Sequence, residues 1–200
     1  MTESRLARLP RHTLNADQAE VYDRIAGGQR AAGPQAFPLV GDDGALEGPF
    51  NAYLHQPALG AALEALGVVI RYGTSLTKRE REIAILLTAA VHDSAFEQYA
   101  HEAVGKQVGL SDDEIQSLRV VEVDVFSDER ERSVAGVVEA ILLRGDLNDE
   151  EYASAITILG VPLLFEVIIL VGHYVTAAMQ LRVFRVGAPD GRKPGGVPES

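Results

Sequence analysis

The amino-acid sequence predicts an all-α protein, from its composition and from the spacing of its apolar residues. Hydrophobic residues make up 46% of the 200 residues and aromatic residues only 6%, without a tryptophan. This composition suits packed helices better than a sheet rich in aromatic and β-branched residues. The stretch 121–126 alternates apolar and polar residues, but we interpret it as a linker. The length fits one domain with a substantial core.

The boundaries of the predicted helices come from caps, glycines and prolines. Capping-box sequences begin at Thr77 and Ser111, where a hydroxyl and a carboxylate three residues later satisfy free N–H groups. The helix that begins at a proline after the first loop has apolar residues at 59, 63, 66 and 70, which is helical spacing. In order, we expect a helix from Asn15 to Gly27, a loop over 28–49, a short turn over 50–56, and helices that begin at Pro57, Thr77, Ser94, Ser111, Ser127, Asn148 and Pro162.

Charge and cysteine content restrict the function. The net charge of −11 argues against nucleic acid, which is bound through Lys and Arg, and against anionic membrane surfaces. The sequence has no cysteine, which excludes disulfides, thiolate nucleophiles and Cys-ligated metals. We expect a cytoplasmic protein, because the first residues lack the apolar segment of a secretory signal.

One segment, Val161 to Leu181, is long enough to span a bilayer. It carries Glu166, His173 and Gln180, and such side chains are expensive in lipid. We therefore interpret it as a buried helix of a soluble oligomer and expect no membrane partner.

The most informative stretch is 76–110, where two acids and a histidine accompany two apolar helices. Glu97 and His101 are four residues apart and share a helix face. Glu82 lies near the start of the preceding helix. A carboxylate beside an imidazole is a common arrangement for proton transfer. No phosphate loop, nucleophile elbow or zincin H-E-x-x-H motif is present.

A longer pattern surrounds these residues. It comprises Leu76-x-x-Arg79-x-Arg81-Glu82, an apolar helix, E-x-x-x-H ending at His101, and Gly109-Leu110-Ser111, with flanking matches at Gly48-Pro49-Phe50-Asn51, His55, Pro57 and GHYVTAAMQLRVF over 172–184. The pattern resembles the carboxymuconolactone decarboxylase family, which also contains the AhpD-type alkylhydroperoxidases. The resemblance covers roughly residues 45–190. It implies an AhpD-like helical bundle assembled as trimers or hexamers.

The resemblance divides the chain into three parts. Residues 1–45 would hold an N-terminal helix and a Gly/Pro-rich loop, 46–186 the carboxymuconolactone decarboxylase-like helical domain, and 187–200 a flexible tail.

The resemblance also assigns roles to individual residues. In the peroxidase branch a pair of cysteines accompanies a relay glutamate and histidine, to which Glu82 and His101 correspond. Ser94 and Glu97 occupy the two cysteine positions, and a hydroxyl cannot cycle through sulfenic acid and disulfide. Thiol peroxidase chemistry is therefore excluded. The decarboxylase branch carries a glutamate four residues before the histidine, as this chain does.

We accordingly expect a cofactor-independent lyase or isomerase that acts on a small carboxylated or lactone-type substrate. His101 would donate the proton, Glu97 would favour its protonated form, and Glu82 would orient the imidazole or relay a proton. Ser94 would hydrogen-bond a substrate oxygen. The remaining candidates for the substrate pocket are His55, Tyr53, Asn51 and His173.

The same residues also fit purely structural roles. Ser94 and Glu97 fit a capping box, the Glu97–His101 pair fits a solvated surface pair, and Glu82 fits a charged helix start. His55 and His173 fit core or interface histidines.

Other functions stay open from the sequence. A 2-His-1-carboxylate metal site is an alternative, although the paired E-x-x-H signature of di-iron bundles is missing, and we expect no metal. The alternative functions are a non-catalytic oligomeric small-molecule-binding protein and an oxidoreductase-like protein without thiol peroxidase activity.

Overall fold

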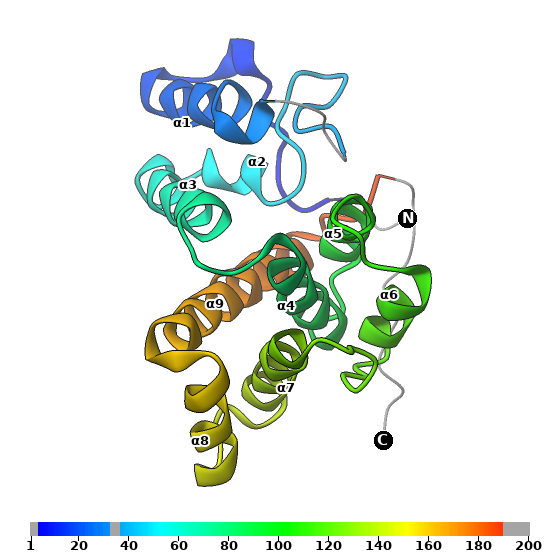
Figure 1. Cartoon of the computed structure of the whole chain (residues 1–200). Coiled ribbons are helices and arrows are strands. Elements are labelled where there is room, and N and C mark those ends of the chain that lie inside the picture. Colours follow the sequence, from blue (N-terminus) through cyan, green and yellow to red (C-terminus); the bar gives the residue numbers. More distant parts are fainter. Residues whose placement is uncertain (1–3, 33–36, 190–200) are drawn as a thin grey trace.

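The computed structural model describes residues 4–32 and 37–189, and within them the chain is helical, without a β-strand (Figure 1). The only strand-like feature in those ranges is an isolated bridge between Val40 and Leu46. The expected all-α class is thereby confirmed. The helices are η1 (Arg11–Thr13), α1 (Ala16–Ala26), η2 (Gln29–Ala31), α2 (Phe50–Tyr53), α3 (Pro57–Tyr72), α4 (Lys78–Val91), α5 (Ala95–Gln107), α6 (Asp112–Arg119), α7 (Glu129–Arg144), α8 (Asp149–Ile158) and α9 (Gly160–Phe184).

Helix α4 is the centre of the molecule and packs against α5, α6, α7 and α9. Its residues from Glu80 to Ala90 are all buried, which explains why its sequence is apolar on every side. The charged first turn is held by neighbours. Arg79 pairs with Glu114 and Glu131 at 2.7 Å each. These ion pairs fix the start of α4 against α6 and α7.

Most helix starts follow the predicted caps. Capping boxes form at Asn15, Thr77, Ser111 and Asn148. Two predicted boundaries differ. Asp128, not Ser127, caps α7, because its carboxylate accepts from the backbone N–H groups of the first turn. Helix α9 begins at Gly160 instead of Pro162, since a proline is tolerated in the first turn, where N–H groups have no helical partner.

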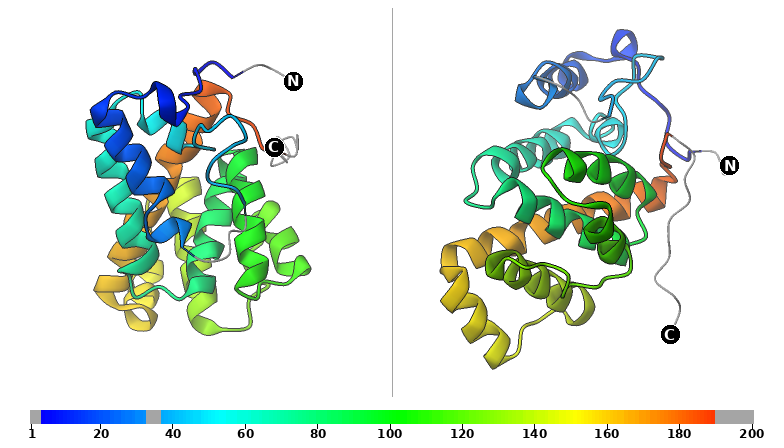
Figure 2. Two further views of the ribbon diagram at one scale, coloured as in Figure 1. Left: turned by 90° about the horizontal axis from the view of Figure 1, so that it is seen from above. Right: turned by 45° about the vertical axis from the view of Figure 1, so that its right-hand side comes forward.

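The N-terminal residues form a second, smaller core at one end of the molecule, opposite α7 and α8 (Figures 1 and 2). Helix α1 packs on α3. The buried apolar side chains of this core are Val21, Tyr22, Ile25, Leu39, Leu46, Phe50, Tyr53 and Leu54. The backbone N–H of Arg5 donates to the carbonyl of Phe184, which joins this end of the chain to the end of α9.

Helix α3 buries an unusual face. Its predicted apolar spacing does not mark the buried side, because Leu59 and Leu66 are exposed. The buried positions are Gly60, Glu64, Gly67 and Ile70. A Cβ at Gly60 would come within 2.4 Å of the Tyr53 carbonyl oxygen, so glycine here allows α2 to approach α3 closely. Gly60 and Gly67 leave room beside α3, and the side chain of Glu64 is buried between them along the helix.

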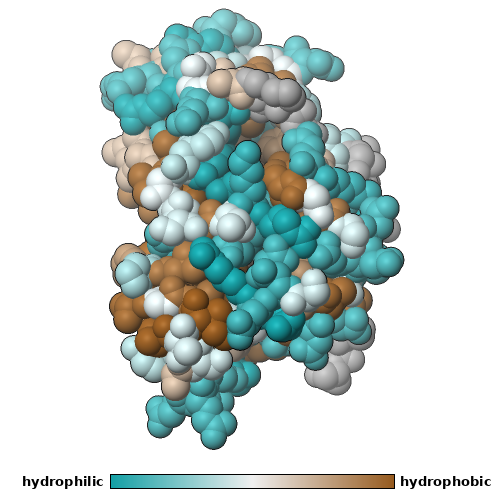
Figure 3. Space-filling model, viewed as in Figure 1, coloured by the Kyte–Doolittle hydropathy of each residue, from teal (hydrophilic) through white to brown (hydrophobic). Residues whose placement is uncertain are grey.

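Helix α9 has one buried face and one exposed apolar face. It is the only helix of the described residues that is long and apolar enough to cross a membrane, a property that core helices of soluble proteins share. Its exposed apolar side chains follow a helical stripe: Val161, Phe165, Ile168, Met179 and Val183. Apolar surface gathers on the side where α9 begins (Figure 3). Of the predicted tail, residues 190–200 lie outside the described ranges.

The exposed stripe of α9 predicts self-association, because a contiguous apolar surface of this kind is covered in most soluble proteins. We expect light scattering at micromolar concentration to give a mass of several 200-residue chains. The double substitution Phe165→Asp and Ile168→Asp should lower that mass to one chain. Leu143→Asp, which changes an equally exposed side chain on α7, serves as the control. A monomeric wild-type protein would contradict the prediction.

Candidate active site

The centre of the candidate site is the ring of His101, which lies between two carboxylates. Its Nδ1 is 2.6 Å from Oε2 of Glu82, and its Nε2 is 3.3 Å from Oε2 of Glu97. Glu82 comes from α4 and the other two residues from α5, and these helices pack side by side. The three side chains are at most 5% exposed. The interpretations of Glu82 as a surface residue and of Glu97–His101 as a solvated pair are therefore wrong.

The two acids hold His101 in its charged form. Burial would lower the pKa of His101, but the Glu82 carboxylate, Tyr174 and hydrogen bonds to both acids outweigh burial and raise the pKa to about 10. Burial would raise the pKa of Glu82, but the charge of His101 and the hydrogen bond between them lower it. The pair is thus an imidazolium and a carboxylate near neutral pH. Both ring N–H groups donate, one to each acid.

A small cavity lies in front of His101. Its volume is about 30 Å³, which is room for about two water molecules. The residues around it come from η2, α2, α3, α5, α9 and nearby loops: Arg30, Phe37, Pro49, Phe50, Tyr53, Leu63, Glu64, Arg71, Phe96, Glu97, Ala100, His101, His173, Tyr174 and Ala177. Four predicted site residues are among them, namely Glu97, His101, Tyr53 and His173. Glu82 lies behind His101 and reaches the cavity only through it.

Ser94 does not line the cavity. It occupies the N-cap position of α5 without a side-chain cap hydrogen bond, so the predicted capping box with Glu97 is wrong. The physical reason is that Glu97 turns toward His101 and does not reach back to the backbone of Ser94. The Oγ of Ser94 is buried and has no hydrogen-bond partner in the described part of the chain.

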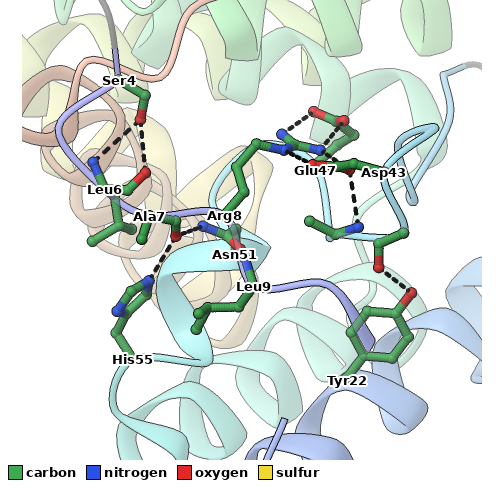
Figure 4. A network of polar contacts seen from close by, with 12 residues as sticks. Ser4, Leu6, Ala7, Arg8, Leu9, Tyr22, Asp43, Glu47, Asn51 and His55 are labelled. Atoms are coloured by element: carbon green, nitrogen blue, oxygen red, sulfur yellow. Dashed lines mark hydrogen bonds and ion pairs between the residues drawn. The ribbon is translucent and has the colours of Figure 1, made fainter. Parts of the chain in front are cut away.

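Asn51 and His55 also lie outside the cavity lining, and both bind the N-terminal segment (Figure 4). The amide of Asn51 accepts from the N–H of Leu9 at 3.0 Å and donates to the carbonyl of Ala7 at 2.9 Å. The exposed His55 places Nε2 3.0 Å from the same Ala7 carbonyl. Their contacts explain these residues as ties between α2 and the N-terminus.

Four polar residues of the cavity were not predicted from the sequence: Arg30, Glu64, Arg71 and Tyr174. The Tyr174 ring meets the His101 ring edge-on, with centroids 5.2 Å apart. Burial would lower the pKa of Arg71, but Tyr174 and Glu82 outweigh it and raise that pKa. A signal existed for Glu64, a charged residue between two glycines on an otherwise apolar helix. Arg71 sits in the last turn of α3, where a cation is expected on dipole grounds alone.

Within residues 4–32 and 37–189, no group of three or more His, Asp or Glu side chains is arranged to hold a metal ion. The positive charge of His101 explains why its own surroundings are unsuited to a cation, since a ligating histidine must be neutral.

The model of the Carboxymuconolactone decarboxylase family matches residues 57–140. This segment includes α4 and α5 with Glu82, Glu97 and His101. The predicted resemblance to this family is confirmed. No curated protein matches the sequence.

Solved structures of the AhpD type have the same fold. An uncharacterized peroxidase-related protein with an alkylhydroperoxidase AhpD core, from Ralstonia eutropha JMP134, has a TM-score of 0.73 at 14% identity, over 94% of this chain and 93% of that one. A protein of unknown function from Agrobacterium tumefaciens, suggested to be an antioxidant defence AhpD, has a TM-score of 0.63 at 19% identity, over 72% of this chain and 99% of that one.

A third similar structure is the debrominase Bmp8, solved as a cysteine-to-alanine variant in complex with 2,3,4-tribromopyrrole. Its TM-score is 0.69 at 11% identity, and 92% of each chain is covered. At these identities the three likenesses establish the AhpD-like fold.

The charged state of His101 predicts how stability depends on pH. The folded pKa of about 10 exceeds the ordinary value of 6.5, so the stabilisation is complete below about pH 6.5 and is lost as pH rises toward 10. We expect the free energy of unfolding to fall over this interval, by at most about 1.4 kcal/mol per pH unit. Urea unfolding at a series of pH values measures it.

The matched control for this measurement is a second histidine. His101→Gln should remove the decline, whereas His12→Gln, at an exposed position, should keep it. An equal slope in His101→Gln and the wild type would show that His101 is not protonated in the folded chain.

Proposed function

We propose that the chain is a cofactor-independent lyase or isomerase that transfers a proton to or from a small carboxylated or lactone-type molecule. The observation that carries the proposal is the buried imidazolium of His101, fixed by Glu82 at 2.6 Å and facing the cavity with Glu97. The match to the carboxymuconolactone decarboxylase family suggests a small-molecule-converting enzyme. The decarboxylase-like chemistry is our inference from the site.

The two N–H groups of the His101 ring have different roles. The Nδ1–H donates to Glu82 and holds the ring in one orientation. The Nε2–H is directed to Glu97, at the wall of the cavity, where a substrate atom can replace that carboxylate as acceptor. An imidazolium with a pKa of about 10 is a weak acid. It therefore gives its proton readily only to a strongly basic atom, such as a carbon that carries a newly formed electron pair.

Decarboxylation produces such an atom. The bond to the carboxylate carbon breaks, carbon dioxide leaves, and the electron pair spreads into an unsaturated carbonyl system as a dienolate. The proton from His101 then forms a new C–H bond at another carbon, and water restores the proton to the ring. The positive charge of the ring stabilises the dienolate before the proton moves. No organic cofactor is needed, because the substrate supplies its own electron sink.

Isomerisation uses the same groups in a different order. Glu97 takes a proton from carbon, the electron pair delocalises into the carbonyl, and His101 returns a proton at a second carbon. The proton on Glu97 then passes to Nε2 of His101, 3.3 Å away, which restores both groups. Atoms balance without any co-reactant. The site therefore favours proton transfer in general, and the substrate decides between loss of carbon dioxide and rearrangement.

The similar structures support a small and compact substrate. The debrominase Bmp8 was solved with 2,3,4-tribromopyrrole, a small ring. The peroxidase-related neighbours do not transfer their name to this chain, because it has no cysteine with which to perform thiol peroxidase chemistry.

The test is turnover of unsaturated lactone carboxylates and β-keto acids in D₂O, followed by NMR. Deuterium incorporated into substrate or product reports proton transfer whether or not carbon dioxide is lost. His101→Ala should lower the rate at least about 100-fold, the usual contribution of a positioned acid, while the helical content is retained. The matched control His12→Ala should keep the wild-type rate. Equal rates in His101→Ala and the wild type would refute the role of His101.

The two alternative functions predict different results with the same panel of lactone carboxylates and β-keto acids. A non-catalytic binding protein would bind members of the panel without product or deuterium exchange. An oxidoreductase-like protein would reduce peroxide with an added dithiol above the buffer rate. The buried Oγ of Ser94, without a partner in the described residues, is the one observation that connects this chain to the redox branch, since it stands at a cysteine position.

A further inference from the structure

Two arginines at the cavity in front of His101 form no direct ion pair with a carboxylate of the described residues. Arg30 and Arg71 line it from η2 and α3. Among the described residues, neither forms an ion pair within 4.0 Å. The Nε atom of each is shielded from solvent and has no hydrogen-bond partner in those residues. Guanidinium groups that are largely shielded from water are normally paired. Arg71 has a hydrogen bond to Tyr174 and the charge of Glu82 nearby, whereas Arg30 has, within the described chain, only its contact with a ring, so two such cations at one cavity require an explanation.

The acids of the cavity are directed elsewhere. Glu97 faces His101, and no ion pair within the described chain joins Glu64 to either arginine. The positive charges of the two arginines repel each other. Burial lowers the pKa of Arg30, and the charge of Arg71 lowers it further. An anion placed between them would remove both the repulsion and the unmet hydrogen bonds.

The position of Arg30 is fixed by its neighbours. Its guanidinium stacks over the ring of Phe50, 5.0 Å from the centroid, a favourable cation–π contact. Its Nη2 lies 3.2 Å, and Nε2 of His173 3.3 Å, from the point where a Cβ at Gly67 would stand. The glycine of α3 thus lets an arginine from the N-terminal segment and a histidine from α9 meet at the wall of the cavity. Arg71 lies one helical turn further along α3.

We propose that Arg30 and Arg71 form a subsite for one carboxylate of the substrate. A guanidinium offers a planar fork of donors that matches a carboxylate. The proposal rests on the proposed function for the view that this cavity receives the substrate, and it adds which residues recognise the substrate and by which group.

The subsite also determines which carboxylate of a substrate stays on the product. A guanidinium stabilises a carboxylate relative to the neutral carbon dioxide that would leave it. The carboxylate bound by Arg30 and Arg71 is therefore the one that stays on the product. If carbon dioxide is lost, it comes from a second carboxyl group nearer His101.

The experiment is a titration of the full chain with crotonate, a small unsaturated carboxylate, followed by broadening of its NMR lines. Crotonamide, which has the same shape without the charge, and inorganic phosphate are titrated in parallel. We expect crotonate to bind at least about tenfold more tightly than the other two. Equal binding of crotonamide would show that charge is not recognised. Equal binding of phosphate would show a general anion site and overturn the assignment.

Variants of the two arginines decide which residues are responsible. Arg30→Met and Arg71→Met should each weaken crotonate binding at least about tenfold. Arg24→Met changes an exposed arginine of α1 that pairs with Glu20 and should leave it unchanged. Arg30→Lys and Arg71→Lys keep the charge but not the fork, and should restore only part of the affinity. Folded methionine variants with wild-type affinity would overturn the proposal, and the helical circular dichroism signal identifies them.

The outcome separates this subsite from the proposed reaction. Loss of affinity in the arginine variants, together with unaffected deuterium exchange in His101→Ala, would retain the subsite and remove the proton-transfer role. The reverse result would retain the reaction and remove the subsite.

Discussion

The contact between Glu82 and His101 is the constraint on which the rest of the site depends. Two opposite charges are buried 2.6 Å apart between α4 and α5, in a setting where either charge alone would be strongly unfavourable. Their mutual attraction requires that α4 carry an acid on an otherwise apolar helix and that α5 lie close enough to present the ring. Tyr174 on α9 completes the enclosure with its ring edge. The hydrogen bond at Nδ1 of His101 thus joins α4 to α5, and the ring contact with Tyr174 adds α9.

The absence of cysteine changes what this frame can do. A thiol pair would exchange electrons, whereas Glu97 beside His101 can only exchange protons. The two acids also make the ring a stronger base than a free imidazole. The fold is shared with peroxidase-related proteins, so the chemistry is decided by side chains and not by topology.

The sequence was most informative where interactions are local. The capping residues Thr77 and Asn148 bond within their own first turn, so the helix starts could be predicted from a few neighbouring residues. The same logic failed at Ser94, because the carboxylate of Glu97 contacts His101, one turn later on the same helix, and not the backbone of Ser94. Nothing local relates Glu82 to His101, 19 residues later; their association was expected only from the family resemblance. Arg30 could not be foreseen, since its place depends on how the N-terminal core packs on α3.

The glycine at position 67 has a consequence for how such a protein can diverge. Arg30 lies outside residues 57–140, which match the family, whereas Glu82, Glu97 and His101 lie within them. Arg30 of the N-terminal segment therefore lines a cavity whose reactive groups belong to residues 57–140. Its guanidinium passes α3 at Gly67, where no side chain blocks it. A substitution of Arg30 alters the lining of the cavity without changing a residue of the Glu82–His101 contact. The lining of the cavity and its reactive groups can therefore change independently of each other in this fold.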